Sequence, residues 1–210
     1  MKAPPEIRQL PELVANQIAA GEVIERPAAV VKELVENSLD AGATRVTVRI
    51  EDGGRRLVEV VDDGHGMRPE QLRAALGRHA TSKIASADDL FRVATLGFRG
   101  EALPSIAAVC EFELASRTHD ADGGHRLLWA GAEDRGGGPC AMAPGTRVAV
   151  RNLFWNVPAR LKFLKSEASE TGHIAEQVTR SALSHPHVAF RLEVDGRGDL
   201  DLPPQEELEG

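Results

Sequence analysis

The clearest periodic pattern in the chain lies at residues 27–41, PAAVVKELVENSLDA. Its large apolar residues fall on one side of a helix with about 3.6 residues per turn, namely Val30, Val31, Leu34, Val35 and Leu39. Pro27 suits the first position of a helix, and Gly42 suits the residue just beyond its last turn. The pattern therefore predicts an amphipathic helix over 27–41 with one face in a core.

Alternation of apolar and polar residues predicts a β-hairpin after this helix. Residues 44–50 (TRVTVRI) and 57–61 alternate as half-buried strands do, and 51–54 form the turn. Similar patterns predict helices at 69–77, 101–109 and 169–184, strands near 110–117, 124–131, 146–153 and 188–194, helical spacing in 11–25, a long loop over 78–100 and a glycine-rich break at 136–138. Because helices and hairpin strands are interleaved without regular β-α-β alternation, we expect an α+β two-layer sandwich.

Charge is distributed unevenly along the 210 residues, whose formal net charge is −7. Residues 195–210 hold six acidic residues and one arginine, whereas 144–166 hold five basic residues and no acidic one. We therefore expect one domain over 1–194 and an acidic tail over 195–210 with a poorly ordered end. The acidic balance argues against coating nucleic acid through bulk charge, but it leaves room for a local basic patch.

Several protein classes are disfavoured by the composition. The first ten residues lack the apolar segment of a secretory signal, and no stretch approaches the roughly 20 apolar residues that span a bilayer. Cys110 and Cys140 match no zinc-binding spacing, and two lone cysteines suit a reducing compartment. We expect a cytoplasmic protein without a membrane partner, associated with the nucleoid if it is bacterial.

Two polar side chains stand at the margin of the predicted 27–41 helix. Glu33 and Asn37 are four residues apart, so they lie about one turn apart on the same side. A carboxylate and a carboxamide in this arrangement suit a general base and a metal ligand. The spacing is equally that of an ordinary solvated helix face, so it does not decide between the two.

A second candidate site follows the strand at 57–61. In VEVVDDGHGM, Asp62 ends a buried strand and can accept a hydrogen bond from an amine such as that of adenine, while Gly64 and Gly66 let the backbone turn or approach a ligand. An ordinary Asp-Gly turn is the alternative interpretation. His65 fits a turn residue better than a metal ligand.

Two further segments suit phosphate. Thr81, Ser82 and Lys83 offer two hydroxyls and a positive charge, although the chain has no Walker A motif and a plain surface loop has the same composition. In LGFRGEAL, two glycines precede a helix whose first N–H groups can bind an anion. Glu101 in the first turn is also explained by its favourable interaction with the helix dipole.

The five segments KELVENSLDAGA, DDGHGM, RHATSK, LGFRGEAL and LFWNVPARLKFL occur in this order. In this order they resemble the N-terminal ATPase of MutL-type DNA mismatch-repair proteins, within the GHKL superfamily. The resemblance covers about residues 6–194. It implies the GHKL (Bergerat) ATPase fold, in which a mixed, mostly antiparallel sheet carries helices on one face.

The resemblance also implies roles for individual residues. Glu33 would activate the attacking water, Asn37 would hold Mg²⁺ against the phosphates of ATP, and Asp62 would bind the adenine amine. Further nucleotide contacts would come from Gly66 and Met67, from Thr81, Ser82 and Lys83, from the lid residues Gly97, Phe98, Arg99, Gly100, Glu101, Ala102 and Leu103, and from Thr146. The expected cofactors are ATP and Mg²⁺, and the expected partners are DNA, a MutS-type mismatch-recognition protein and, in the full-length protein, a second copy in an ATP-dependent homodimer.

The chain departs from the family pattern in four places. Asp63 stands where Asn is usual, His65 where a small residue or Cys is common, and the YNTPAR segment reads WNVPAR at 155–160. The second subdomain, which supplies a lysine to the γ-phosphate, and the dimerisation domain do not follow in this sequence. A non-hydrolysing nucleotide-binding scaffold is therefore the alternative function. Other GHKL classes are disfavoured because their further domains are not visible in this sequence. A metal hydrolase is disfavoured because the histidines show no HExxH-like spacing.

The basic stretch at 144–166 has two interpretations. It can be a solvated basic face, or it can be part of a DNA-binding groove that contacts phosphates through Arg151, Arg160, Lys162 and Lys165. Binding of the second kind depends on salt and little on base sequence.

Overall fold

A computed structural model describes residues 24–77, 101–131 and 133–205 of the chain. Within them, eight strands form one sheet in the order β5-β4-β3-β6-β2-β1-β7-β8. The strands are β1 Arg45–Glu51, β2 Leu57–Asp62, β3 Glu111–Arg117, β4 Gly124–Ala130, β5 Glu133–Cys140, β6 Gly145–Arg151, β7 Ala189–Val194 and β8 Arg197–Leu202. The pairs are antiparallel except β1 with β7, which is parallel. The sheet is thus mixed and mostly antiparallel.

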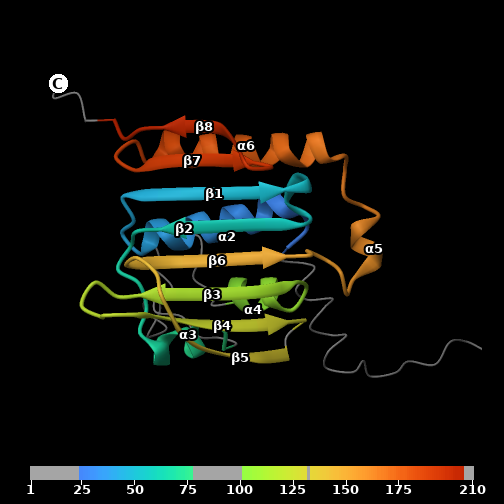
Figure 1. Ribbon diagram of the computed structural model, residues 1–210. Helices are drawn as coiled ribbons and strands as arrows, with labels where there is room; N and C mark the ends of the chain where they lie inside the picture. The colour runs from blue at the N-terminus through green and yellow to red at the C-terminus, as the bar shows by residue number, and fades with distance from the viewer. Residues whose placement is uncertain (1–23, 78–100, 132, 206–210) are drawn as a thin grey trace, which may run out of the picture.

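Helices cover one face of this sheet (Figure 1). They are α2 Pro27–Asp40, α3 Pro69–Ala75, α4 Ala102–Ala107 and α6 Glu167–Ser184, while the short α5 Pro158–Leu161 lies beyond the end of the strands. Helix α2 contacts β2 and α6, α6 contacts β7, and α3 and α4 contact β3. The predicted α+β two-layer sandwich with helices on one face is therefore confirmed.

The core forms where the apolar stripe of α2 meets the sheet. Val30, Val31 and Val35 are fully buried, and so are Val46 and Val48 of β1. Ala41 ends α2, and Gly42 follows with a φ of 69°, which is the left-handed conformation that glycine adopts without strain. The predicted helix is correct to within one residue, because one face of a regular helix accounts for every large apolar side chain in the segment.

The expected break at 136–138 is wrong, since β5 runs through it as an edge strand paired with β4. A Cβ on Gly137 would lie 2.1 Å from the carbonyl oxygen of Arg126, so the missing side chains allow the close approach of the two strands. Pro139 is tolerated because an edge strand has one side without ladder hydrogen bonds. Glycine content indicated a loop here, but backbone pairing with β4 determines the structure.

A second difference concerns the acidic segment that begins at residue 195. Asp195 and Gly196 have φ values of 48° and 77°, and they connect β7 to the antiparallel β8. Two positive φ values in a two-residue connection are typical of a type I′ hairpin turn, for which Asp-Gly is a favoured sequence. Residues 197–202 are therefore a strand of the sheet rather than part of a tail. The expected disorder concerns 206–210, which lie outside the described residues, as do the expected loop at 78–100 and most of the helical pattern in 11–25.

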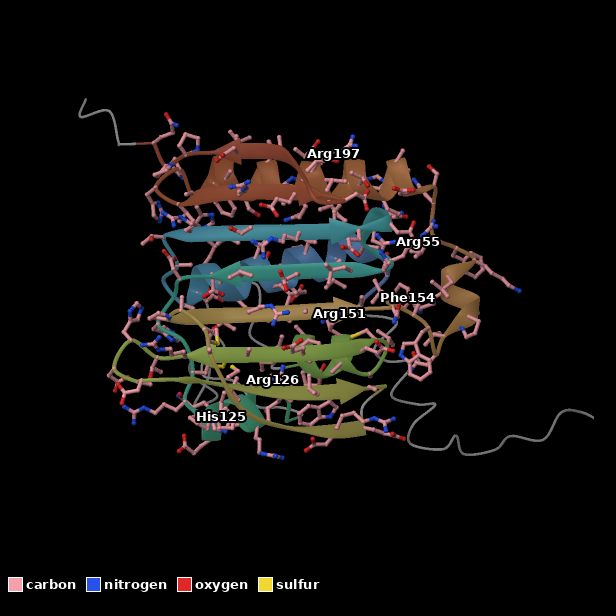
Figure 2. All side chains as sticks on the ribbon, in the orientation of Figure 1. Arg55, His125, Arg126, Arg151, Phe154 and Arg197 are labelled. Atoms are coloured by element: carbon pink, nitrogen blue, oxygen red, sulfur yellow. The ribbon has the colours of Figure 1, made fainter. Side chains whose placement is uncertain are left out.

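The face of the sheet without helices carries alternating arginines and glutamates, which we call the ion-pair ladder. Arg49 pairs with Glu193 and Glu59 at 2.8 Å, and Arg147 pairs with Glu59 at 2.6 Å and with Glu113 at 3.0 Å. Its other members, which form ion pairs with Glu113 or Glu193, are Arg126, Arg151 and Arg191. Burial raises the pKa of Glu59, but hydrogen bonds from the two arginines outweigh this and hold that pKa below its ordinary value. Figure 2 shows Arg151 and Arg126 on this face.

Candidate nucleotide site

Helix α2 presents the candidate general base and the candidate metal ligand at the edge of its buried face. Glu33 and Asn37 are half-buried one turn apart. Lys32 lies between two carboxylates, with its Nζ atom 3.5 Å from Glu33 and 3.3 Å from Glu36. Within the described part of the chain, the Asn37 carboxamide makes no hydrogen bond. Its oxygen is therefore available to a ligand.

The carboxylate of Asp62 lies where β2 ends, beside the last turns of α2. Its Oδ2 atom accepts a hydrogen bond from the hydroxyl of Ser38 at 2.8 Å. Its Oδ1 atom accepts from the amides of Gly64 at 3.0 Å and Thr146 at 3.1 Å. Burial raises the pKa of Asp62, and these hydrogen bonds to the charged form limit the rise. A carboxylate has about four lone-pair positions, so one on Oδ2 remains for a ligand.

Asp62, Thr146 and Ser116 form a row across three neighbouring strands. Asp62 is paired with Thr146 in the β2–β6 register, and Thr146 with Ser116 in the β6–β3 register. Opposite residues in an antiparallel pair project from the same face, and here that is the helix-covered face. The Ser116 hydroxyl donates to the carbonyl of Gly145 at 2.8 Å, accepts from the amide of Met67 at 2.8 Å and lies 3.0 Å from the Thr146 hydroxyl.

Two glycines permit the close packing of the loops around this row. Gly66 has a φ of 70°, and a Cβ there would lie 2.1 Å from the carbonyl oxygen of Arg117. Gly145 has a φ of 121°, and a Cβ there would lie 2.0 Å from the carbonyl oxygen of Asp62. Any other residue at either position would push the loop away from the strand ends. The glycine that the sequence marked for close approach at 66 thus has a structural reason, and Gly145 has one that the sequence did not indicate.

Asp63, which stands where the family usually has Asn, caps the beginning of β1. Its carboxylate accepts from the amides of Thr44 and Arg45 at 2.7 and 2.8 Å and from the Thr44 hydroxyl at 2.7 Å. Burial alone raises its pKa, but these hydrogen bonds outweigh that effect and hold the pKa below its ordinary value. All of these contacts hold the start of β1 in place. His65 donates its backbone amide to the carbonyl of Ala41 at 3.0 Å, which supports its interpretation as a turn residue.

The expected phosphate-binding residues are only partly described. Thr81, Ser82, Lys83, Gly97, Phe98, Arg99 and Gly100 lie outside the described residues. Glu101 immediately precedes α4, which begins at Ala102, and Leu103 packs against the core. The structure therefore describes the adenine end of the expected site and α2, but not most of the expected lid.

The basic candidates have different environments. Arg151 belongs to the ion-pair ladder through Glu113 at 3.4 Å. The guanidinium of Arg160 lies 6.0 Å from the ring centre of Phe154 and donates to the carbonyl of Ile24. Lys162 and Lys165 are exposed, and neither forms an ion pair with the described residues. These two lysines are thus the basic side chains of this stretch that are free for an external anion.

Sequence reasoning missed Ser38 and Ser116, which hold the predicted residues in place. Both are almost fully buried, at 2% and 1% exposure. Ser38 directly follows Asn37 in the sequence, and this position within the motif is the signal that could have identified it. Ser116 is recognised only from the strand register, which no local pattern reveals.

A metal ion has few protein ligands in the described region. Among residues 24–77, 101–131 and 133–205, no group of three or more His, Cys, Asp or Glu side chains is placed to hold one. A single carboxamide oxygen such as that of Asn37 suits Mg²⁺, which usually keeps several waters and completes its shell with substrate phosphates. The residues present therefore fit Mg²⁺ bound together with a nucleotide.

In the same described ranges, no helix is long and apolar enough to cross a membrane.

Comparisons with known proteins show which family the chain resembles. Residues 25–126 match the family model described as histidine kinase-, DNA gyrase B- and HSP90-like ATPase. The chain is 60% identical over 198 residues to the DNA mismatch repair protein MutL of Xanthomonas oryzae, covering 94% of this chain and 32% of that protein. MutL of Geobacter sulfurreducens is 58% identical over 194 residues, with 92% and 32% coverage. The chain thus spans about a third of the length of these curated relatives.

A solved structure supports the same assignment. The Aquifex aeolicus MutL ATPase domain complexed with ADP superposes with a TM-score of 0.72 and 38% sequence identity, over 88% of this chain and 66% of that one. The chain therefore belongs to the histidine kinase-, DNA gyrase B- and HSP90-like ATPase family, in which it matches the N-terminal ATPase domain of MutL-type proteins.

Proposed function

We propose that this chain binds ATP and hydrolyses it with Mg²⁺. The observation that carries the proposal is the hydrogen bond from Ser38 of α2 to Asp62 at 2.8 Å. It joins the candidate adenine-binding carboxylate to the helix that carries Glu33 and Asn37. The base of a nucleotide held at Asp62 would thus lie beside that helix, toward which its phosphates can extend. The ADP named with the Aquifex aeolicus domain supports a nucleotide as the ligand.

The chemistry of each described residue suits a different role in binding and hydrolysing ATP. Asp62 accepts a hydrogen bond from the exocyclic amine of adenine on the free lone pair of Oδ2. Asn37 would hold Mg²⁺ through its unengaged carboxamide oxygen, and Mg²⁺ when bound neutralises charge on the phosphate oxygens. Glu33 accepts a proton from the attacking water and orients it toward the γ-phosphorus. We assign phosphate contacts to Thr81, Ser82, Lys83 and the segment from Gly97 to Leu103 as well.

The experiment that tests this function titrates the chain with labelled ATP, with and without Mg²⁺, and measures phosphate release under single-turnover conditions. We expect saturable binding, tighter with Mg²⁺, and slow release of phosphate. Absence of saturable binding would contradict the whole proposal. Binding without any phosphate release would leave the alternative, a non-hydrolysing nucleotide-binding scaffold.

We also propose that the segment around α5 contacts DNA backbones. Lys162 and Lys165 are exposed without ion-pair partners among the described residues, and Trp155 and Phe163 of the same segment are 49% and 85% exposed. Basic side chains next to exposed aromatic rings suit sequence-independent nucleic-acid binding. Arg160 contributes at the margin, whereas Arg151 is paired with Glu113 at 3.4 Å in the ion-pair ladder.

Replacing Lys162 with Ala should weaken duplex-DNA binding and make it less dependent on salt. Loss of one phosphate contact lowers the slope of log affinity against log salt by about 0.9. The measurement is fluorescence anisotropy of a labelled duplex over a range of salt concentrations. Arg197→Ala, which removes an exposed arginine from β8 (Figure 2), should leave the slope unchanged. Equal slopes for both variants would contradict the assignment.

In the longer protein, we propose that ATP binding by this domain controls dimerisation and the engagement of DNA and of a MutS-type mismatch-recognition protein. Similarity to MutL proteins over 94% of this chain supports the proposal. The domain would then act in mismatch repair in the cytoplasm, as a switch whose state is set by the bound nucleotide.

A further inference from the structure

The hydroxyl groups of Ser116 and Thr146 face each other inside the candidate adenine site. Ser116 is 1% exposed and Thr146 is 9% exposed. Three polar atoms surround the Ser116 oxygen, which are the Gly145 carbonyl at 2.8 Å, the Met67 amide at 2.8 Å and the Thr146 hydroxyl at 3.0 Å. Because the Ser116 hydroxyl has a single hydrogen to donate, these contacts restrict the direction in which that hydrogen points.

The hydrogen of Ser116 goes to Gly145. A carbonyl oxygen only accepts, so two oxygens 2.8 Å apart need the Ser116 hydrogen between them. The Met67 amide already donates to the Ser116 oxygen. The remaining contact is then satisfied only if the Thr146 hydroxyl donates its own hydrogen to Ser116. This one arrangement of the two hydroxyl hydrogens makes a hydrogen bond at each of the three contacts of Ser116.

This arrangement determines what Thr146 offers a ligand. With its hydrogen committed to Ser116, the Thr146 oxygen presents lone pairs alone to the site. Asp62, directly opposite Thr146 in the strand register, is likewise an acceptor, since Oδ2 takes one hydrogen bond from Ser38 and keeps a free lone pair. The site therefore offers two neighbouring acceptors, which suit the two hydrogens of an exocyclic amine, directly or through a water.

We propose that Ser116 is a positioning residue that fixes the Thr146 hydroxyl as an acceptor and thereby makes the site selective for purines with a 6-amino group. The inference rests on the proposed nucleotide binding and extends it to the origin of base selectivity. Ser116 acts through Thr146 and contacts no part of the nucleotide. Without Ser116, the Thr146 hydroxyl is free to rotate and to donate into the site, which removes one of the two acceptors.

The test compares the affinities of ATP and of purine riboside 5′-triphosphate, which is ATP without the 6-amino group. The ratio of the two affinities isolates what the amine contributes. Ser116→Ala should lower this ratio about tenfold, the size expected when one hydrogen bond of the amine is lost. Thr146→Val should lower it by a similar factor, and the double variant should show no further decrease, because the two residues act as one unit. Ser181→Ala, which removes a buried hydroxyl from α6, is the matched control and should leave the ratio unchanged.

The outcomes test separately the role of Thr146, the role of Ser116 and the proposed nucleotide binding. If Thr146→Val weakens both nucleotides equally, Thr146 does not serve the amine and the inference is overturned. If Thr146→Val lowers the ratio but folded Ser116→Ala does not, the role of Ser116 is overturned. Thermal unfolding of each variant establishes that it is folded, and the Thr146→Val arm decides the polarity of the site even if Ser116→Ala is unstable. Failure of the parent chain to bind either nucleotide contradicts the proposed function instead.

Discussion

Glu33→Gln should abolish most ATP turnover while leaving ATP binding nearly unchanged. The carboxamide keeps the size of the carboxylate but cannot accept the proton of the attacking water. Loss of a general base lowers a rate by about 10²–10⁴-fold. Phosphate release under single-turnover conditions measures the rate, and titration with labelled ATP measures the affinity.

The matched control for this variant is Glu36→Gln. Glu33 and Glu36 lie on the same helix and both pair with Lys32, at 3.5 and 3.3 Å. The two variants therefore remove the same charge from the same lysine, and only Glu33 lies on the Asn37 side of the helix. A parental rate in Glu33→Gln, or an equal loss in both variants, would show that Glu33 is not the base.

Asp62→Asn should fold normally and lose most of its affinity for ATP. The amide oxygen can keep the hydrogen bonds from Gly64 and Thr146, and the Ser38 hydroxyl can turn to the Leu34 carbonyl 3.1 Å away. The amide nitrogen then presents hydrogens where adenine also presents hydrogens. A mismatched polar group in a buried site costs at least about 100-fold in affinity, which titration with labelled ATP measures.

Asp63→Asn is the matched control for Asp62→Asn, since it makes the same chemical change one residue away. Asp63 contacts Thr44 and Arg45 at the start of β1, and it has no role in the proposed site. We expect ATP affinity to be retained. Undiminished binding by Asp62→Asn would contradict adenine recognition by that carboxylate, and equal losses in both variants would indicate a general effect on the loop.

Local pattern predicted the regular elements well and the sheet edges poorly. Helix α2 and the β1–β2 hairpin follow from residues that meet the core on one face, so periodicity identified them. Strands β5 and β8 lie at the two edges of the sheet, where half of the backbone is unpaired and few side chains are buried. Their glycines, proline and charges resemble those of loops. The Asp195-Gly196 turn is the local signal for β8, and the acidic composition around it obscures that signal.

The candidate site shows a similar division. The spacing predicts that Glu33 and Asn37 lie on one helix face. The order of motifs, through the resemblance to the family, predicts that Asp62 and Thr146 contact the adenine ring. No local pattern relates Ser116 to Asp62, because the two are 54 positions apart in sequence and only the strand register places both beside Thr146. Residues that bind a ligand lie in short motifs, whereas residues that orient them depend on strand pairing.

The parallel pairing of β1 with β7 has a consequence for how the chain folds during synthesis. Arg49 and Glu193, which pair across these strands, are 144 residues apart in sequence. At roughly 5–20 residues per second, a ribosome needs about 7–30 s to make that interval. During this time the β1–β2 hairpin has an open edge that can pair with another chain. Arg45 and Arg49 alternate with apolar residues along β1, and their charges discourage such association until β7 arrives.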